Sequence, residues 1–169
     1  MALLEREWVD VGESHIFFHS RADASFMSNF HPATFVVGDI TFSCVEQFFQ
    51  WRKMTMFQKD EVAARILDAT EPASMKALAR RGKGARLTPD QVSEWNLASM
   101  DVMREGVSAK FHQNPDLRDA LIGTGSATLV ERLSGRLADR TWGTSGPRAV
   151  GRNQLGVILM RLREEMATV

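Results

Sequence analysis

The stretch from Thr88 to Phe111 reads TPDQVSEWNLASMDVMREGVSAKF and carries the clearest helix signal of the chain. Threonine is a favoured N-cap, proline suits the first turn, and Gln91 completes a capping box three residues after Thr88. Apolar residues then recur on or near one face, at Val92, Trp95, Met103 and Val107. We therefore predict a long amphipathic helix that ends at about Phe111.

Further helices are predicted on both sides of this stretch. The first runs from Val45 to Phe57, with Ser43 as its N-cap and Glu46 completing a capping box. The others are expected over residues 59–69, from Pro72 to a stop at Gly82, from Asn114-Pro115 to Gly123, and from Leu155 to Met166. Their apolar residues follow helical spacing, and proline suits the first turn of two of them.

The predicted strands are short. His15–Phe18 is rich in β-forming residues, and Thr34–Val37 and Ile40–Phe42 flank Gly38-Asp39 as a hairpin. Residues 127–131 are strand-like, whereas Ser134 to Arg152 is predicted to be a loop rich in Gly, Arg, Ser and Thr. No linker or repeat interrupts residues 1–169. We expect one compact multihelical domain, mainly α with a small N-terminal β portion (α+β).

Composition narrows the classes of function. Lys plus Arg and Asp plus Glu number 21 each, so the net charge of the 169 residues is zero. This balance argues against a protein that coats nucleic acid by counterion release, but allows contact with a few phosphates at a local site. With Cys44 as its single cysteine, the chain forms no internal disulfide. Without a signal peptide or an apolar stretch of about 18 residues, it is expected to be soluble and intracellular, in the cytoplasm or nucleus.

Several kinds of site lack their sequence signals. The four histidines form no H-x-x-x-H pair and one cysteine offers no zinc framework, so we expect no metal. No Walker loop, G-x-G-x-x-G or G-x-S-x-G motif occurs, and no cofactor is expected. A Ser-His-Asp catalytic triad that lacks the G-x-S-x-G motif stays possible.

One helix face carries unusual chemistry. Glu46, Gln50 and Lys53 are separated by four and three residues, so a carboxylate, an amide and an amine share one face. The ordinary interpretation of such a pattern is a solvated stripe with an ion pair. The neighbouring Phe48, Phe49 and Trp51 leave little of this helix for solvent, which favours a functional role.

A second candidate lies late in the chain. Residues 139–143 read DRTWG and residues 151–156 read GRNQLG. Glycines and arginines suit a loop that wraps a ligand and pairs with phosphate. The alternative is a surface loop in which glycine relieves backbone strain and Trp142 anchors packing.

Eight blocks in order together resemble the NADAR family, also called the YbiA-like family. The blocks are Ser28-Asn29-Phe30, Val45-Glu46-Gln47-x-x-Gln50-x-x-Lys53, Trp95, Lys110-Phe111-x-Gln113-Asn114-Pro115, Thr124-Gly125, Leu129-Val130-Glu131, Asp139-x-x-Trp142-Gly143 and Gly151-x-Asn153-x-Leu155-Gly156-x-x-Leu159-Met160. They span about residues 16–163. One departure concerns the loop after Trp142-Gly143, where bacterial riboflavin-type members often carry further glycines and this chain has Thr144-Ser145 before Gly146-Pro147.

The resemblance implies where the functional residues lie. The family's positions fall here on Glu46, Lys53, Trp95, Asp139 and Trp142. We take Glu46, Lys53 and Asp139 as catalytic candidates. Substrate contacts are expected from Ser28, Asn29, Phe30, Gln50, Trp95, Trp142, Gly143, Arg152 and Asn153.

The resemblance also implies an N-glycosidase with one of two substrates. Some members of the family cleave early riboflavin intermediates, which are phosphoribosylamino-pyrimidines, and others remove ADP-ribose from guanine in nucleic acid. In both, the reacting bond joins C1 of a 5-phosphorylated ribose to an exocyclic amine. We favour ADP-ribosylated guanine because the chain has no fused riboflavin-pathway domain, its net charge suits a nucleotide or one flipped-out residue, and Arg140, Arg148 and Arg152 can meet a pyrophosphate. Whether DNA or RNA carries the base stays open.

Two mechanisms and one non-catalytic role stay open at this point. Lys53 can form a Schiff base with C1 if its amine is uncharged, with Glu46 or Asp139 shuttling protons. Alternatively, Glu46 or Asp139 activates water, and Lys53 holds phosphate or orients a carboxylate. A domain that only binds ADP-ribose or NAD is the third possibility, although it would have no need of three titratable groups together.

Overall fold

The computed structural model describes residues 15–19, 26–133, 141–145 and 150–168. The chain divides into two units, each of which is described by itself. The central unit comprises residues 32–113, and the terminal unit combines residues 1–31 with 114–169. The expectation of a single domain over residues 1–169 stays a prediction.

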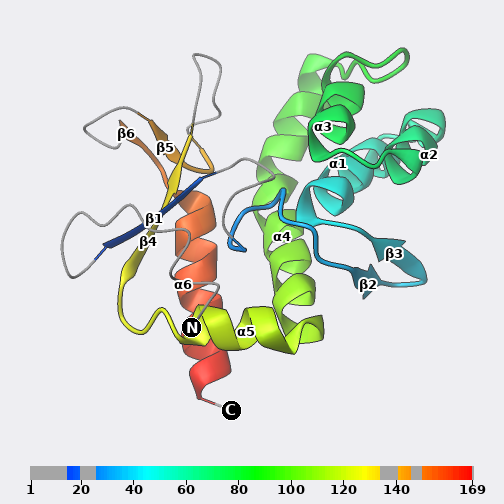
Figure 1. Cartoon of the computed structure of the whole chain (residues 1–169). Coiled ribbons are helices and arrows are strands. Elements are labelled where there is room, and N and C mark those ends of the chain that lie inside the picture. The colour runs from blue at the N-terminus through cyan, green and yellow to red at the C-terminus, as the bar shows by residue number, and fades with distance from the viewer. Residues whose placement is uncertain (1–14, 20–25, 134–140, 146–149, 169) are drawn as a thin grey trace. The chain divides into compact units, whose positions relative to one another are not determined.

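The central unit begins with a hairpin of β2 (Phe35–Val37) and β3 (Ile40–Phe42) and continues as four helices (Figure 1). These are α1 (Val45–Met56), α2 (Asp60–Asp68), α3 (Pro72–Arg81) and α4 (Pro89–Gln113). The two-residue turn of the hairpin has Gly38 at φ +59°, a left-handed conformation that glycine adopts readily. The Gln113 side chain binds the backbone N–H and C=O of Val36, at 2.8 Å each, and ties the end of α4 to β2.

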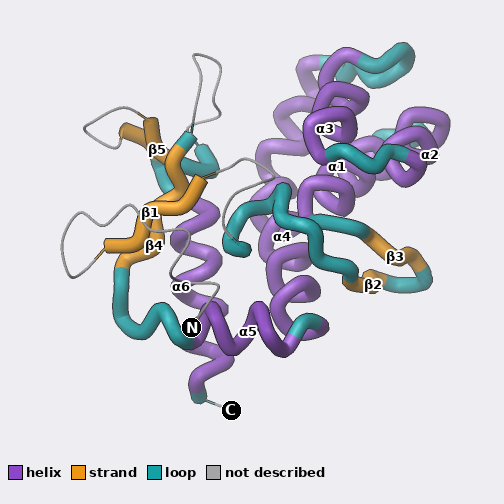
Figure 2. Tube along the Cα trace, in the orientation of Figure 1, coloured by secondary structure: helices purple, strands orange, loops and turns teal. Residues whose placement is uncertain are grey.

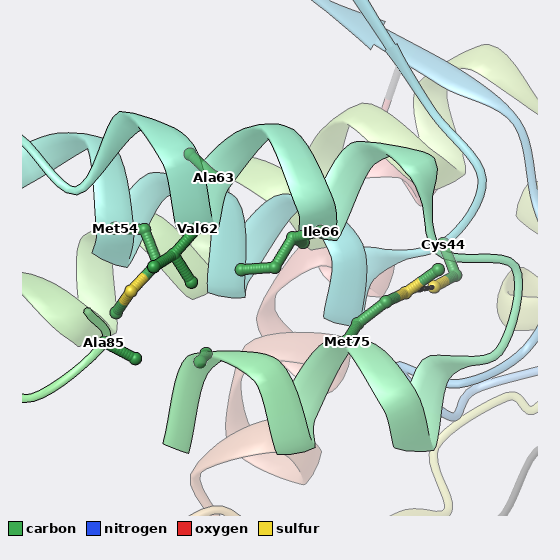
Figure 3. Close-up of a cluster of buried hydrophobic side chains, with 8 residues drawn as sticks. Cys44, Met54, Val62, Ala63, Ile66, Met75 and Ala85 are labelled. Atoms are coloured by element: carbon green, nitrogen blue, oxygen red, sulfur yellow. Dashed lines mark hydrogen bonds between the residues drawn. The ribbon is translucent and has the colours of Figure 1, made fainter. Parts of the chain in front are cut away.

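Helix α1 lies at the centre of this unit, packed against each of the other three helices. On one side, Phe42 and Phe48 meet edge to face with ring centres 5.2 Å apart. On another, a buried cluster joins α1, α2 and α3 through Cys44, Met54, Val62, Ala63, Ile66, Met75, Ala79 and Ala85 (Figure 3). Gly106 brings α4 close to α1, since a Cβ there would lie 2.5 Å from Cδ1 of Phe48. Apolar burial on two sides therefore fixes the helix that carries Glu46, Gln50 and Lys53.

Of the two predicted capping boxes, one is confirmed and one is wrong. At the start of α4, the Thr88 N–H donates to Oε1 of Gln91 at 3.0 Å, and the Gln91 N–H donates to Oγ1 of Thr88 at 3.3 Å. Helix α1 instead has Cys44 at its N-cap with no side-chain cap. The Ser43 N–H and hydroxyl both donate to Oε1 of Gln47, at 2.8 and 3.0 Å, while Glu46 is buried. Tertiary burial of the glutamate replaces the local box.

In its described residues, the terminal unit contains a four-stranded sheet and two helices. Strand β1 (His15–His19) pairs in parallel with β4 (Thr128–Arg132), His15 lying opposite Thr128. Strand β5 (Thr144–Ser145) continues the sheet beside β4, and β6 (Val150–Gly151) closes it antiparallel to β5. Helix α6 (Gln154–Ala167) packs on β4 and on α5 (Pro115–Ile122).

Comparison with the expectations confirms the helical fold with its small β portion, as Figure 2 also makes plain. The helix boundaries agree closely with the predicted ones. The prediction of a loop throughout residues 134–152 is wrong, because β5 and β6 lie within it. No helix in the described parts of the chain is long and apolar enough to cross a membrane.

Candidate active site

Glu46, Gln50 and Lys53 lie on one face of α1, as their spacing predicted. The Glu46 and Gln50 side chains are only 4% and 8% exposed, and Lys53 is half-buried. Nε2 of Gln50 donates a hydrogen bond to Oε1 of Glu46 at 2.9 Å. The face is therefore a largely dry row of polar groups rather than a solvated stripe.

Trp95, on α4, extends this face. Its ring meets Phe49 edge-on with the ring centres 4.9 Å apart, and Nζ of Lys53 lies 5.9 Å from the indole centre. Trp95 is 7% exposed, so the buried indole forms an apolar wall beside the half-buried lysine. Four residues that the sequence singled out thus meet within the central unit.

Burial shifts both titratable groups toward their neutral forms. Desolvation raises the pKa of Glu46, opposed by the charges of Lys76 and Lys53 and by the Gln50 hydrogen bond. Desolvation likewise lowers the pKa of Lys53, opposed by the charge of Glu46. The charge of each group favours the charged form of the other, yet burial is the largest cause of both pKa shifts. Both shifts are therefore toward the neutral form, for the Glu46 carboxyl group and for the Lys53 amine.

Gln47 holds α1 to α2 through its side-chain amide. Its Nε2 donates to the carbonyl oxygens of Ile66 and Leu67 at 3.1 Å each, at the end of α2. Because Oε1 of the same amide accepts from Ser43, this side chain joins the start of α1 to α2. The sequence pattern contains Gln47 but assigns it no role, since its partners are carbonyl groups about twenty residues away.

Lys76 on α3 is a residue that sequence reasoning missed. Its charge opposes the rise in the Glu46 pKa more strongly than that of Lys53 does. The preceding Met75 places it, with Sδ 3.8 Å from Sγ of Cys44, two residues before Glu46 (Figure 3). Because this proximity arises only when α3 packs on α1, no spacing in the sequence reveals it.

The late candidates lie in the terminal unit, where Asn153 has a structural role. It occupies the left-handed region at φ 50° and is the N-cap of α6. Its Nδ2 donates to the Leu129 carbonyl at 2.8 Å, and its Oδ1 accepts from the Glu131 N–H at 3.0 Å. The carbonyl of Trp142 accepts from the Leu155 N–H at 3.0 Å. These contacts hold the start of α6 to β4, and substrate contact by Trp142 and Asn153 stays a prediction.

Glu131, like Gln47, belongs to the blocks that resemble the family but has no role assigned from the sequence. It is 4% exposed, and a Cβ at the buried Gly143 would lie 2.9 Å from its Oε2. Glycine at this position therefore leaves room for a buried carboxyl group. The close approach of Gly143 to Glu131 therefore requires a residue without a side chain at position 143.

The remaining predicted residues are placed as follows. Ser28 is fully buried and its Oγ accepts from the Phe30 N–H at 3.1 Å. Asn29 is buried, Phe30 is half-buried, and Arg152 is exposed. The catalytic candidate Asp139, with Arg140 and Arg148, lies outside the described residues. Within the described ranges, no three His, Cys, Asp or Glu side chains gather closely enough to hold a metal.

The order of the motifs has its counterpart in known proteins. A family model described as the NADAR domain matches residues 16–167. The chain belongs to the NADAR family. The resemblance noted in the sequence is thereby confirmed.

Among its NADAR relatives, the protein irg-1 of Caenorhabditis elegans is 31% identical over 86% of this chain and 77% of its own. The N-glycosidase YbiA of Escherichia coli is 32% identical over 89% of this chain and 87% of its own. The NMR structure of E. coli YbiA matches with a TM-score of 0.72 and 30% identity, covering 99% of this chain and 94% of that one. Relatives within the NADAR family thus carry the name N-glycosidase.

Proposed function

We propose that this protein is an N-glycosidase that hydrolyses the bond between C1 of a ribose and an exocyclic base amine. Its preferred substrate is ADP-ribosylated guanine in nucleic acid. The observation that carries the proposal is the dry face of α1, where burial favours a neutral Lys53 amine and a protonated Glu46. The names of NADAR relatives support the reaction class.

The two groups suit a covalent route through C1. Opening of the sugar ring converts the glycosylamine to an imine, and the uncharged Nζ of Lys53 adds to C1. The base amine then leaves C1 with a proton from the Glu46 carboxyl group, and a Schiff base between Lys53 and C1 remains. Water adds to that carbon, Glu46 recovers its proton, and Lys53 leaves as the sugar aldehyde closes again. The balance is one water consumed, with ADP-ribose released and an unmodified guanine left in the strand.

The surroundings favour this assignment of roles over direct attack by water. Because its pKa is raised, Glu46 carries a proton up to a higher pH than an ordinary glutamate does, which suits it as the proton donor. A free lysine has a pKa of about 10.4 and would be protonated at neutral pH, so the lowering of the Lys53 pKa is what makes nucleophilic attack feasible. Trp95 serves as a wall beside the base and C1.

The test uses a short single-stranded oligonucleotide that bears ADP-ribose on guanine. Wild type is compared with Glu46→Gln, Lys53→Ala and the half-buried control Lys59→Ala, and release of ADP-ribose is measured. We expect loss of release in the two site variants only, and a borohydride-trapped adduct on Lys53 of the wild type. Release without an adduct would exclude the covalent route.

Two further outcomes would revise the substrate or the function. Cleavage of a phosphoribosylamino-pyrimidine, with no release from the oligonucleotide, would assign the protein to riboflavin intermediates. Binding of ADP-ribose without cleavage of either compound would make it a binding module. Both compounds contain the same C1–N bond, so a single assay format serves for the comparison.

A further inference from the structure

The segment between Glu71 and Asp90 has a charge pattern unlike that of the whole chain. It contains no acidic residue and five cations, namely Lys76, Arg80, Arg81, Lys83 and Arg86. All five side chains are exposed. Because the chain as a whole is neutral, this excess is a local feature of α3 and the loop that follows it.

Packing explains why these cations face solvent. Met75 and Ala79 of α3 are buried in the cluster with α1 and α2, and Ala85 of the following loop joins them (Figure 3). The loop turns tightly, since the Ala85 N–H donates to the Gly82 carbonyl at 3.0 Å and Gly84 has φ +84°. Burial of the apolar side fixes the backbone of α3 and of the loop, and the five cationic side chains remain exposed.

Arg65 of α2 adds a sixth cation. Its Nη2 donates to the carbonyl of Lys83 at 2.6 Å, which brings α2 and the loop together. Within the described residues, no ion pair involves Arg65, Arg80, Arg81, Lys83 or Arg86. We call Arg65, Lys76, Arg80, Arg81, Lys83 and Arg86 the basic surface of α3.

This surface begins next to the candidate active site. Lys76 is the member whose charge acts on Glu46, and the contact of Met75 with Cys44 fixes its position beside α1. Arg80 lies one helical turn further along α3 on the same face as Lys76. A ligand held at Glu46 and Lys53 can therefore continue along the cations of α3.

We propose that the basic surface of α3 binds the phosphodiester backbone of a single nucleic-acid strand beside the modified base. The identity of that base rests on the proposed function. Six exposed cations exceed what the pyrophosphate of one ADP-ribose can pair with, whereas a strand offers a phosphate at every nucleotide.

A protein partner fits this surface less well. Protein interfaces have an apolar core, while interfaces with nucleic acid are polar and strongly positive. The exposed large hydrophobic residues of the described chain are Val36, Met56, Val92, Leu97 and Val150, and none lies between Glu71 and Asp90. The surface is therefore charged without an apolar centre.

The binding test uses the full chain and a short, unmodified, fluorescein-labelled single strand, with anisotropy measured at several salt concentrations. Wild type is compared with Arg80→Gln/Lys83→Gln and with Arg104→Gln/Arg161→Gln, which removes two exposed arginines elsewhere. Each phosphate contact contributes about 0.7 to the slope of log K against log salt, so the first variant should lose about 1.4. The control should keep the wild-type slope.

Several results would overturn the proposal: no binding of the strand by wild type, equal slopes in both variants, or equally tight binding of polyglutamate. A second measurement compares kcat/KM for the ADP-ribosylated oligonucleotide and for ADP-ribosylated guanosine. Arg80→Gln/Lys83→Gln should lose activity several-fold on the oligonucleotide alone, and equal losses on both would instead indicate a pyrophosphate contact. If neither compound is cleaved, the proposed function fails, and the anisotropy still decides the role of the surface.

Discussion

Nε2 of Gln50 donates a hydrogen bond to Oε1 of Glu46 at 2.9 Å, one helical turn away on α1. A hydrogen bond to a carboxylate favours its ionised form, so the amide partly opposes the desolvation of this buried acid. Gln50 thus adjusts the pH at which Glu46 carries a proton, and it is a positioning residue for that group. The first prediction follows from this relationship.

Replacing Gln50 by methionine, which has a similar length, should raise the pKa of Glu46 further. The pH at which Glu46 loses its proton then moves upward, and the high-pH limb of kcat/KM that depends on this acid moves with it. A profile of kcat/KM against pH measures the shift, with the exposed Gln58→Met as control. An unchanged limb would mean that Glu46 is not the group that titrates in the reaction.

The raised pKa of Glu46 also predicts how stability depends on pH. The folded state holds this proton to higher pH than the unfolded chain does, so the contribution is fully present below about 4.5, the ordinary value, and is lost as the pH rises through the folded pKa. The free energy of unfolding of wild type should therefore fall relative to that of Glu46→Gln as the pH rises above this value. Urea titrations at several pH values measure the difference, and parallel curves would contradict the shift.

Asn153 should matter for stability through two side-chain hydrogen bonds and a left-handed backbone. Asn153→Ala loses both bonds and places alanine at φ 50°, which should cost about 2–4 kcal/mol of unfolding free energy. Asn153→Gly loses the same bonds without the backbone strain and should be about 1 kcal/mol less destabilising. Denaturant unfolding of both variants gives these values. A Gly variant of wild-type stability that lacks activity would favour the predicted substrate contact.

Gly106 should be intolerant of a side chain, because its Cβ would lie 2.5 Å from the Phe48 ring. Gly106→Ala should destabilise the protein by about 1–3 kcal/mol through overpacking, less a gain of up to about 1 kcal/mol in helix propensity. Asn96→Ala, at an exposed position of the same helix, gives a gain in helix propensity without overpacking. Thermal or denaturant unfolding measures the stability of both variants. Equal stability of Gly106→Ala and Asn96→Ala would exclude a tight contact between α1 and α4.

The helices were predictable because their signals are local. Thr88 and Gln91 form the box that their spacing predicts, and Pro72 and Pro115 begin helices as their missing N–H groups allow. The box of Ser43 and Glu46 failed because burial of the glutamate outweighs a local hydrogen bond. Strands β5 and β6 contain two residues each, too few for an alternating pattern, and they exist through pairing within the sheet.

The residues of the candidate site likewise divide into those that local spacing predicts and those that depend on tertiary packing. Helical spacing alone brings Glu46, Gln50 and Lys53 together, whereas Trp95 was identified as a site residue through the family resemblance. Lys76 was missed because its approach to Glu46 depends on the packing of α3 against α1. The shifted pKa values of Glu46 and Lys53 likewise depend on a depth of burial that no short pattern specifies.

The parallel pairing of β1 with β4 has a consequence for biosynthesis. The ribosome makes residues 15–19 early, yet their partners at 128–132 follow only after the whole run from 32 to 113. The central unit is continuous in sequence, so it is free to fold during translation while the first strand still awaits its neighbour. A nascent chain that stops before Thr128 therefore keeps β1 as an unpaired edge, a natural target for chaperones and for aggregation.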